Sequence, residues 1–183
     1  MVYIFLAEGF EEIEALTVVD MLRRAKIGIA MVSITRNNMV TGAHKIKIVT
    51  DILFEDSEYG DAEMFILPGG MPGTTNLMQH DGLGKLLVQA GKKGKNLAAI
   101  CAAPRVLGSK GLLKGKNATC YPGTEDISFG AKYLDADVIA DGNVITSRGM
   151  GTAIDFSLSL ITRLKNKEEA IKVAEAIQYR HYE

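Results

Sequence analysis

Leu97-Ala98-Ala99-Ile100-Cys101-Ala102-Ala103-Pro104 is the stretch of sequence that decides the fold class. Its apolar first half is typical of a buried strand. The small residues and the proline after Cys101 predict that a helix begins there, because the first helical turn has no use for the N–H that proline lacks. Free N–H groups at a helix N-terminus favour negative charge, so the junction predicts a lowered pKa for the Cys101 thiol. The structural alternative is a buried cysteine that packs as a small hydrophobe, and this segment alone leaves both interpretations open.

Strand-like and helix-like patterns alternate on both sides of this junction. Strands are predicted at residues 2–6, 29–34 and 64–67, with a half-exposed strand near a sheet edge at 44–50 and a hairpin formed by 138–140 and 144–147. Apolar stripes at helical spacing lie within residues 15–22, 83–90, 153–164 and 170–177. The alternation predicts an α/β fold, a three-layer sandwich with a largely parallel sheet and helices on both faces. Ligands bind beyond the carboxyl ends of the strands in such sheets.

Composition points to an ordinary globular protein. The 183 residues are 47% hydrophobic and 23% charged, with a formal net charge of -1. We expect one domain over residues 1–183, because there is no linker-like segment, repeat or low-complexity tract. The near-neutral charge offers no global field for nucleic acid or membranes, and no apolar run approaches the ~20 residues of a membrane helix. Two cysteines without a pairing motif favour a reducing compartment, so a cytoplasmic location is expected.

Glu14 is the second candidate for chemistry. It precedes Val18 by four residues, so it shares the apolar face of the first predicted helix. A carboxylate directed inward needs a partner or a raised pKa. Glu11 and Glu12 are expected to favour the helix dipole or to face water. If Glu14 meets Cys101, an ionised carboxylate would raise the thiol pKa, whereas a protonated one would donate a hydrogen bond to a thiolate or to a sulfinate.

Gly69-Gly70 follows the strand predicted at 64–67. The Gly70 N–H and the Ala102 N–H could together form an oxyanion hole. The run Gly69-Gly70-Met71-Pro72-Gly73 matches neither the dinucleotide fingerprint nor a P-loop, and a tight turn without a chemical role is the structural alternative.

Metal binding finds little support in the spacing. His44, His80 and His181 are widely separated, and each is expected to be a surface residue, so no metal ligand set is predicted. Cys120 has no partner at the spacing of a redox motif. It is expected to be a bystander, or a resolving thiol if the fold brings it near Cys101.

Four blocks in order along the chain resemble one protein family. They are Glu11-Glu12-Ile13-Glu14, Leu67-Pro68-Gly69-Gly70, Ala99-Ile100-Cys101-Ala102-Ala103-Pro104 and Thr146-Ser147-Arg148-Gly149. Together they resemble the ThiJ/PfpI superfamily, and most closely its branch of the parkinsonism-associated protein deglycase, also called DJ-one. The resemblance implies a flavodoxin-like sandwich, a homodimer, and a nucleophilic, oxidation-sensitive cysteine.

The resemblance also implies roles for particular residues. Cys101 becomes the nucleophile, Glu14 its protonated partner, and Gly70 and Ala102 backbone donors to an oxyanion. The peptidase branch has a histidine where this chain has Ala102, which disfavours a cysteine peptidase. Where the deglycase branch has a histidine before a proline, this chain has Tyr121-Pro122, and a tyrosine with an unperturbed pKa near 10 is a poor base at neutral pH.

Two functions are therefore weighed. The first is a cofactor-free glyoxalase or deglycase that acts on reactive dicarbonyls or glycated substrates, without metal or glutathione. The second is an oxidative-stress sensor or chaperone in which Cys101 becomes a sulfinate, and the tyrosine at position 121 favours this one.

Overall fold

The structure is a computed structural model that describes residues 1–181. Seven strands form the main sheet in the order β10-β11-β7-β6-β1-β2-β5, and all neighbours are parallel except the antiparallel pair β10 and β11. Their bounds are β1 Val2–Leu6, β2 Ile29–Ser33, β5 Ile52–Leu53, β6 Met64–Leu67, β7 Asn96–Ile100, β10 Val138–Asp141 and β11 Val144–Ser147. Two small sheets pair β3 (Met39–Thr41) with β4 (Lys47–Val49) and β8 (Asn117–Ala118) with β9 (Lys132–Tyr133).

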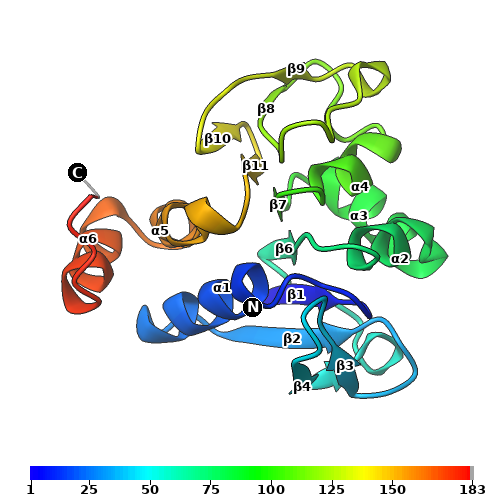
Figure 1. Cartoon of the computed structure of the whole chain (residues 1–183), viewed down its shortest axis with the longest axis horizontal. Coiled ribbons are helices and arrows are strands. Elements are labelled where there is room, and N and C mark those ends of the chain that lie inside the picture. The colour runs from blue at the N-terminus through cyan, green and yellow to red at the C-terminus, as the bar shows by residue number, and fades with distance from the viewer. Residues whose placement is uncertain (182–183) are drawn as a thin grey trace.

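Helices cover both faces of the main sheet, as the alternating pattern predicted. Figure 1 shows α1, α5 and α6 on one side and α2, α3 and α4 on the other. The bounds are α1 Glu12–Arg24, α2 Gly73–Gln79, α3 Asp81–Lys92, α4 Pro104–Ser109, α5 Ala153–Leu164 and α6 Lys167–Ala176. Short 3-10 helices occupy η1 Phe54–Asp56, η2 Ile127–Phe129 and η3 Met150–Thr152. The predicted three-layer α/β sandwich is confirmed.

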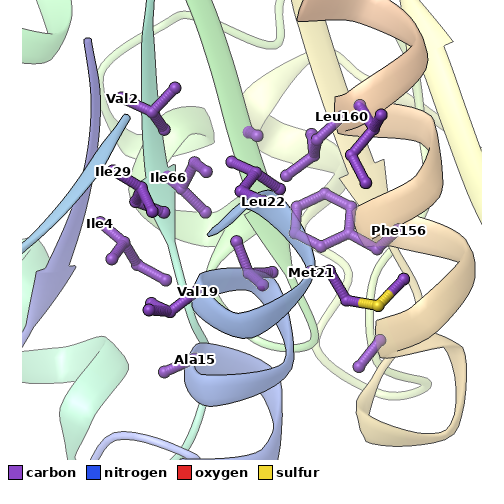
Figure 2. Packing of buried hydrophobic residues seen from close by; sticks show 14 of the residues in the cluster. Val2, Ile4, Ala15, Val19, Met21, Leu22, Ile29, Ile66, Phe156 and Leu160 are labelled. Carbon is purple, nitrogen blue, oxygen red and sulfur yellow. The ribbon is translucent and has the colours of Figure 1, made fainter. Parts of the chain in front are cut away.

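Alternate residues of the strands feed two separate apolar cores. In β1, Ile4 points toward α1 and α5, whereas Phe5 points into the layer of α2, α3 and α4. Figure 2 shows the first core, where Leu22 of α1 and Phe156 of α5 lie with Ile66 of β6. All of these side chains are fully buried, so the sheet is sealed on both faces and its loops are left at the two ends.

The segment predicted as a strand at 44–50 is only partly one. Residues 47–49 form β4, which pairs with β3 in a hairpin outside the main sheet, so the prediction of a strand near the sheet edge is wrong. Glu12 fastens this hairpin to α1: the backbone N–H of His44 donates to its Oε1 at 2.8 Å, and the His44 ring lies 2.9 Å from its Oε2. Glu12 is 3% exposed and lies in the first turn of α1, so it meets the expectation of an acidic residue at the helix dipole and not the alternative that it faces water.

Loops after neighbouring parallel strands meet at one end of the sheet. The N–H of Glu11, in the loop after β1, donates to the carbonyl of Gly69 after β6 at 2.9 Å. The N–H of Cys101, directly after β7, donates to the carbonyl of Ser147 at the end of β11 at 3.0 Å. The fold therefore gathers the candidate residues at the carboxyl ends of the strands, where α/β proteins bind ligands.

Among the helices of the described residues, none is both long enough and apolar enough to cross a membrane.

Candidate active site

Cys101 lies at the turn between β7 and α4, as predicted. Its φ is +64°, a left-handed conformation that costs a residue with a side chain roughly 1–2 kcal/mol. Backbone contacts hold it there: beside the Ser147 contact, the Cys101 carbonyl accepts a hydrogen bond from the N–H of Tyr121 at 2.8 Å. Pro104 opens α4 three residues later. The strained turn leaves Cys101 partly exposed at the end of an otherwise buried strand.

Glu14 points from the first turn of α1 toward this thiol. It is 1% exposed, in line with its predicted place on the apolar face. Its Oε2 accepts a hydrogen bond from the Gly69 N–H at 2.8 Å, and its side chain also hydrogen-bonds to that of Cys101. Oε1 is buried and meets no nitrogen or oxygen donor among residues 1–181. Because Oε2 is already an acceptor, a proton on this carboxyl sits on Oε1.

Gly69 is the residue that allows the two side chains to meet. A Cβ at this position would lie 2.7 Å from the Cβ of Cys101 and 2.7 Å from Oε2 of Glu14. Both distances are shorter than a non-bonded contact permits, so any side chain at 69 would separate the pair. The tight turn considered from the sequence thus has a steric role beside the thiol.

Backbone donors surround the Cys101 sulfur. The N–H groups of Gly70 and Ala102 hydrogen-bond to it and lower its pKa. Gly70 has a φ of +90°, which turns the backbone after Gly69 and which glycine adopts without strain. An anion that forms at the sulfur, or on an atom bonded to it, therefore meets N–H groups already in place.

Burial is the main influence on the pKa values of Glu14 and Cys101. Desolvation raises the pKa of Glu14 to about 7, against the lowering effect of its hydrogen bonds to Cys101 and Gly69. Desolvation and the charge of an ionised Glu14 raise the pKa of Cys101 to about 12. The lowered thiol pKa expected from the helix end alone is therefore wrong, because burial and the neighbouring carboxylate outweigh the N–H groups. When Glu14 is protonated the repulsion disappears, so the pocket holds one negative charge rather than two.

Tyr121 and Cys120 follow one another near the turn at Cys101, but one is exposed and the other is buried. Tyr121 is 53% exposed and is joined to Cys101 through its backbone N–H. Cys120 is 4% exposed and lines a cavity of about 200 Å³ with Glu125, Tyr133, Leu134, Asp135 and Arg148. Burial raises the pKa of the Cys120 thiol, so neither access nor charge favours its reaction.

Glu11, Glu12 and His44 form a cluster that sequence spacing did not predict. Each offers one ligating atom, and these atoms lie within 4.8 Å of one another. Both oxygens of Glu12 are already engaged by the hairpin, so these contacts explain the cluster without an ion. His44 is exposed as expected, whereas the Nδ1 of His80 accepts the Leu83 N–H and caps α3. His181 also lies at the surface.

The contact at Gly69 yields a first prediction. We expect Gly69→Ala to slow alkylation of Cys101 by limiting iodoacetamide at least roughly tenfold near pH 6, where Glu14 keeps its proton, because the added methyl separates the thiolate from this hydrogen-bond donor. Peptide mapping measures the rate, and the labelling of the buried Cys120, which we expect to be much slower, serves as the internal reference. Gly60→Ala is the matched control, since a Cβ at position 60 meets nothing within 4 Å. Equal rates in the two variants would contradict the steric role of Gly69.

The raised pKa of Glu14 yields a second prediction. The folded chain keeps this proton up to about pH 7, whereas the unfolded chain releases it near the ordinary value of 4.5. The folded state therefore binds more protons between these values, and the free energy of unfolding falls as pH rises through this window. The full shift corresponds to roughly 3 kcal/mol at most.

We expect Glu14→Gln to lose this part of the pH dependence, because an amide does not ionise. Urea unfolding of both proteins near pH 5 and near pH 8 measures it. A variant that loses as much stability as the original chain between these two pH values would show that another group is responsible.

Comparison with known proteins finds relatives that match most of this chain. The chain is 33% and 36% identical to the Arabidopsis thaliana proteins named DJ-1 homolog B and DJ-1 homolog A, over 93% of its own length but 39% and 44% of theirs. It thus spans about two fifths of the length of these relatives. It is 34% identical over 164 residues to a Caenorhabditis elegans protein named glutathione-independent glyoxalase DJR-1.2, covering 88% of this chain and 87% of the relative.

A solved structure shares the whole fold. The oxidized DJ-1 of Toxoplasma gondii superposes with a TM-score of 0.92 at 33% identity, covering 98% of each chain. The model of the DJ-1/PfpI family matches residues 1–163, which include the strand-to-helix turn at Cys101, the buried Glu14 and the Gly69-Gly70 loop. With the fold, the order of its motifs and this match in agreement, the chain belongs to the DJ-1/PfpI family.

Proposed function

We propose that this chain is a cysteine-dependent enzyme that converts reactive 1,2-dicarbonyls such as methylglyoxal, or their early adducts on proteins, in a glyoxalase or deglycase reaction. The observation that carries the proposal is a buried carboxyl with a pKa of about 7 in side-chain contact with a partly exposed thiol. A group that titrates near neutral pH can both give and take a proton during turnover. The name of the Caenorhabditis elegans relative supports the same class of reaction.

The first step joins substrate and enzyme. The Cys101 thiolate, formed by loss of the thiol proton to solvent while Glu14 keeps its own, adds to the aldehyde carbon of methylglyoxal, a C–S bond forms, and the carbonyl electron pair moves onto oxygen. The N–H groups of Gly70 and Ala102 are placed to stabilise that charge. Glu14 then gives its Oε1 proton to the oxygen, which leaves a hemithioacetal and a carboxylate.

The second step moves hydrogen between neighbouring carbons. The Glu14 carboxylate takes the proton from the carbon bonded to sulfur and returns it to the adjacent carbon. The hydroxyl proton passes from the first oxygen to the second through the enediol, so the hemithioacetal becomes a thioester. Water cleaves the thioester, which restores the Cys101 thiol. The sum is methylglyoxal plus water giving lactate and a proton, with no net oxidation. These steps use Cys101, Glu14 and backbone N–H groups alone, so no metal, glutathione or other cofactor is proposed.

A redox role is the second candidate for the same thiol. Two equivalents of a peroxide would convert the Cys101 thiolate to a sulfinate, whose oxygens would meet the protonated Glu14 and the N–H groups of Gly70 and Ala102. Tyr121 favours this role, because it replaces a histidine base with a weaker one at neutral pH. Intact mass after mild peroxide, measured beside methylglyoxal turnover, separates an oxidative-stress sensor from an enzyme. Ala102 leaves a peptidase without its base.

Glu14 variants test the proton transfer. Gln keeps both an acceptor for the Gly69 N–H and a donor for the sulfur, but cannot accept a proton from carbon. We therefore expect Glu14→Gln to alkylate at Cys101 nearly as fast as the original chain while methylglyoxal turnover falls at least roughly 100-fold. Glu14→Asp shortens the arm by about 1.5 Å, so both measurements should fall. Turnover that survives in Glu14→Gln would overturn the proposed role of Glu14.

We also propose that two copies of the chain pair through a face built by α1 and the β3–β4 hairpin. Large apolar side chains are exposed there: Ile13 by 50%, Ile46 by 51% and Val49 by 63%. Glu12 fixes the hairpin against α1, which brings together the two elements that carry these side chains. Exposed apolar side chains grouped on one face are typical of interaction sites.

We expect a dimer in sedimentation analysis and a monomer for Val49→Asp, since a buried unpaired carboxylate opposes association. The matched control is Ile127→Asp, which changes an 86% exposed side chain on η2 and should leave the dimer intact. A chain that sediments as a monomer, or a Val49→Asp variant that still pairs, would exclude this face.

A further inference from the structure

A second group of exposed apolar side chains lies on segments next to the turn at Cys101, away from the proposed dimer face. Met71 is 58% exposed, Tyr121 53% and Met150 50%. Met71 and Tyr121 lie in the segments after β6 and β8, and Met150 opens η3 after β11. Each large apolar side chain left in water forfeits the free energy of burial, so three of them around one reactive group need a reason.

Tyr121 contacts the Cys101 backbone directly, and Met71 and Met150 are chain neighbours of two glycines near the turn. Met71 directly follows Gly70, whose N–H hydrogen-bonds to the sulfur. Tyr121 donates its own N–H to the Cys101 carbonyl. Met150 directly follows Gly149.

The Tyr121 ring also packs onto this last loop. Its Cδ2 lies 3.3 Å from where a Cβ on Gly149 would stand. Tyr121 therefore links the Cys101 turn to the segment that leads into Met150.

We propose that Met71, Tyr121 and Met150 form an apolar collar that selects dicarbonyls bearing an apolar or aromatic substituent over glyoxal itself. This inference rests on the proposed function for the identity of the substrate, but the collar also applies to any electrophile that reaches Cys101. Thioether chains adapt their shape to a ligand, and an aromatic ring offers a flat face for stacking.

Two ionisable side chains near the collar, Arg148 and Glu14, offer a substrate no unpaired charge. Arg148, in the loop between Ser147 and Gly149, is paired with Asp135. A protonated Glu14 adds no charge at the thiol. A substrate substituent that contacts the collar therefore binds through burial of apolar surface. This favours an aryl or alkyl substituent over a hydrogen atom.

Alkylation of Cys101 tests the collar without turnover. The probes are iodoacetamide and its N-benzyl derivative. The rate at which each probe alkylates Cys101 is divided by its rate with free glutathione, which removes the difference in intrinsic reactivity. We expect Cys101 to favour the benzyl probe roughly tenfold, and Tyr121→Ala and Met71→Ala each to reduce that ratio at least about threefold. Tyr121→Phe should keep the preference, because it retains the ring. Ile127→Ala, an exposed apolar residue outside the collar, is the control and should leave the ratio unchanged.

Turnover gives the second arm. The ratio of kcat/KM for phenylglyoxal to that for glyoxal should fall in Tyr121→Ala relative to the original chain. A benzyl preference that is absent, or that persists in both alanine variants, overturns the collar. Absence of any dicarbonyl turnover together with an intact alkylation preference overturns the proposed function and leaves the collar as a site for apolar electrophiles.

Discussion

A single negative charge shared by Glu14 and Cys101 is the constraint on which the rest of the site depends. Two charges held this close and this far from water would repel strongly, so one of the two groups keeps its proton. Burial of Glu14 raises its pKa to about 7, and the N–H groups of Gly70 and Ala102 stabilise a charge on the sulfur. The charge can then sit on sulfur when the carboxyl is neutral.

That arrangement needs three neighbouring parallel strands. The β1 strand delivers the first turn of α1, β6 delivers Gly69, and β7 delivers Cys101, each at its carboxyl end. Since β1, β6 and β7 are adjacent in the sheet, their loops meet without long excursions. The left-handed turn at Cys101 is held by hydrogen bonds to Ser147 and Tyr121, so its strain is offset by contacts outside the pair itself.

Sequence reasoning worked where one periodicity dominated. The inward place of Glu14 followed from helical spacing, and the strand-to-helix turn at Cys101 followed from an apolar run ending before Pro104. It failed where tertiary contacts decide. The burial of Glu12 depends on N–H groups 32 and 34 residues away, in the hairpin. The thiol pKa depends on desolvation, which no local pattern reports, so the helix end alone gave the wrong direction.

The two candidate functions use the Cys101 sulfur in the same way and differ in the role of the Glu14 proton. Peroxide and dicarbonyl are both electrophiles, and the same thiolate with the same N–H donors attacks either one. Oxidation to a sulfinate uses the Glu14 proton only as a fixed hydrogen-bond donor. Isomerisation of a hemithioacetal requires that proton to leave the carboxyl and a second proton to arrive from carbon. A carboxyl with the ordinary pKa of 4.5 would be a weak base for that step, whereas one near 7 is matched to it, and this match makes the enzymatic role the better account of why Glu14 is buried.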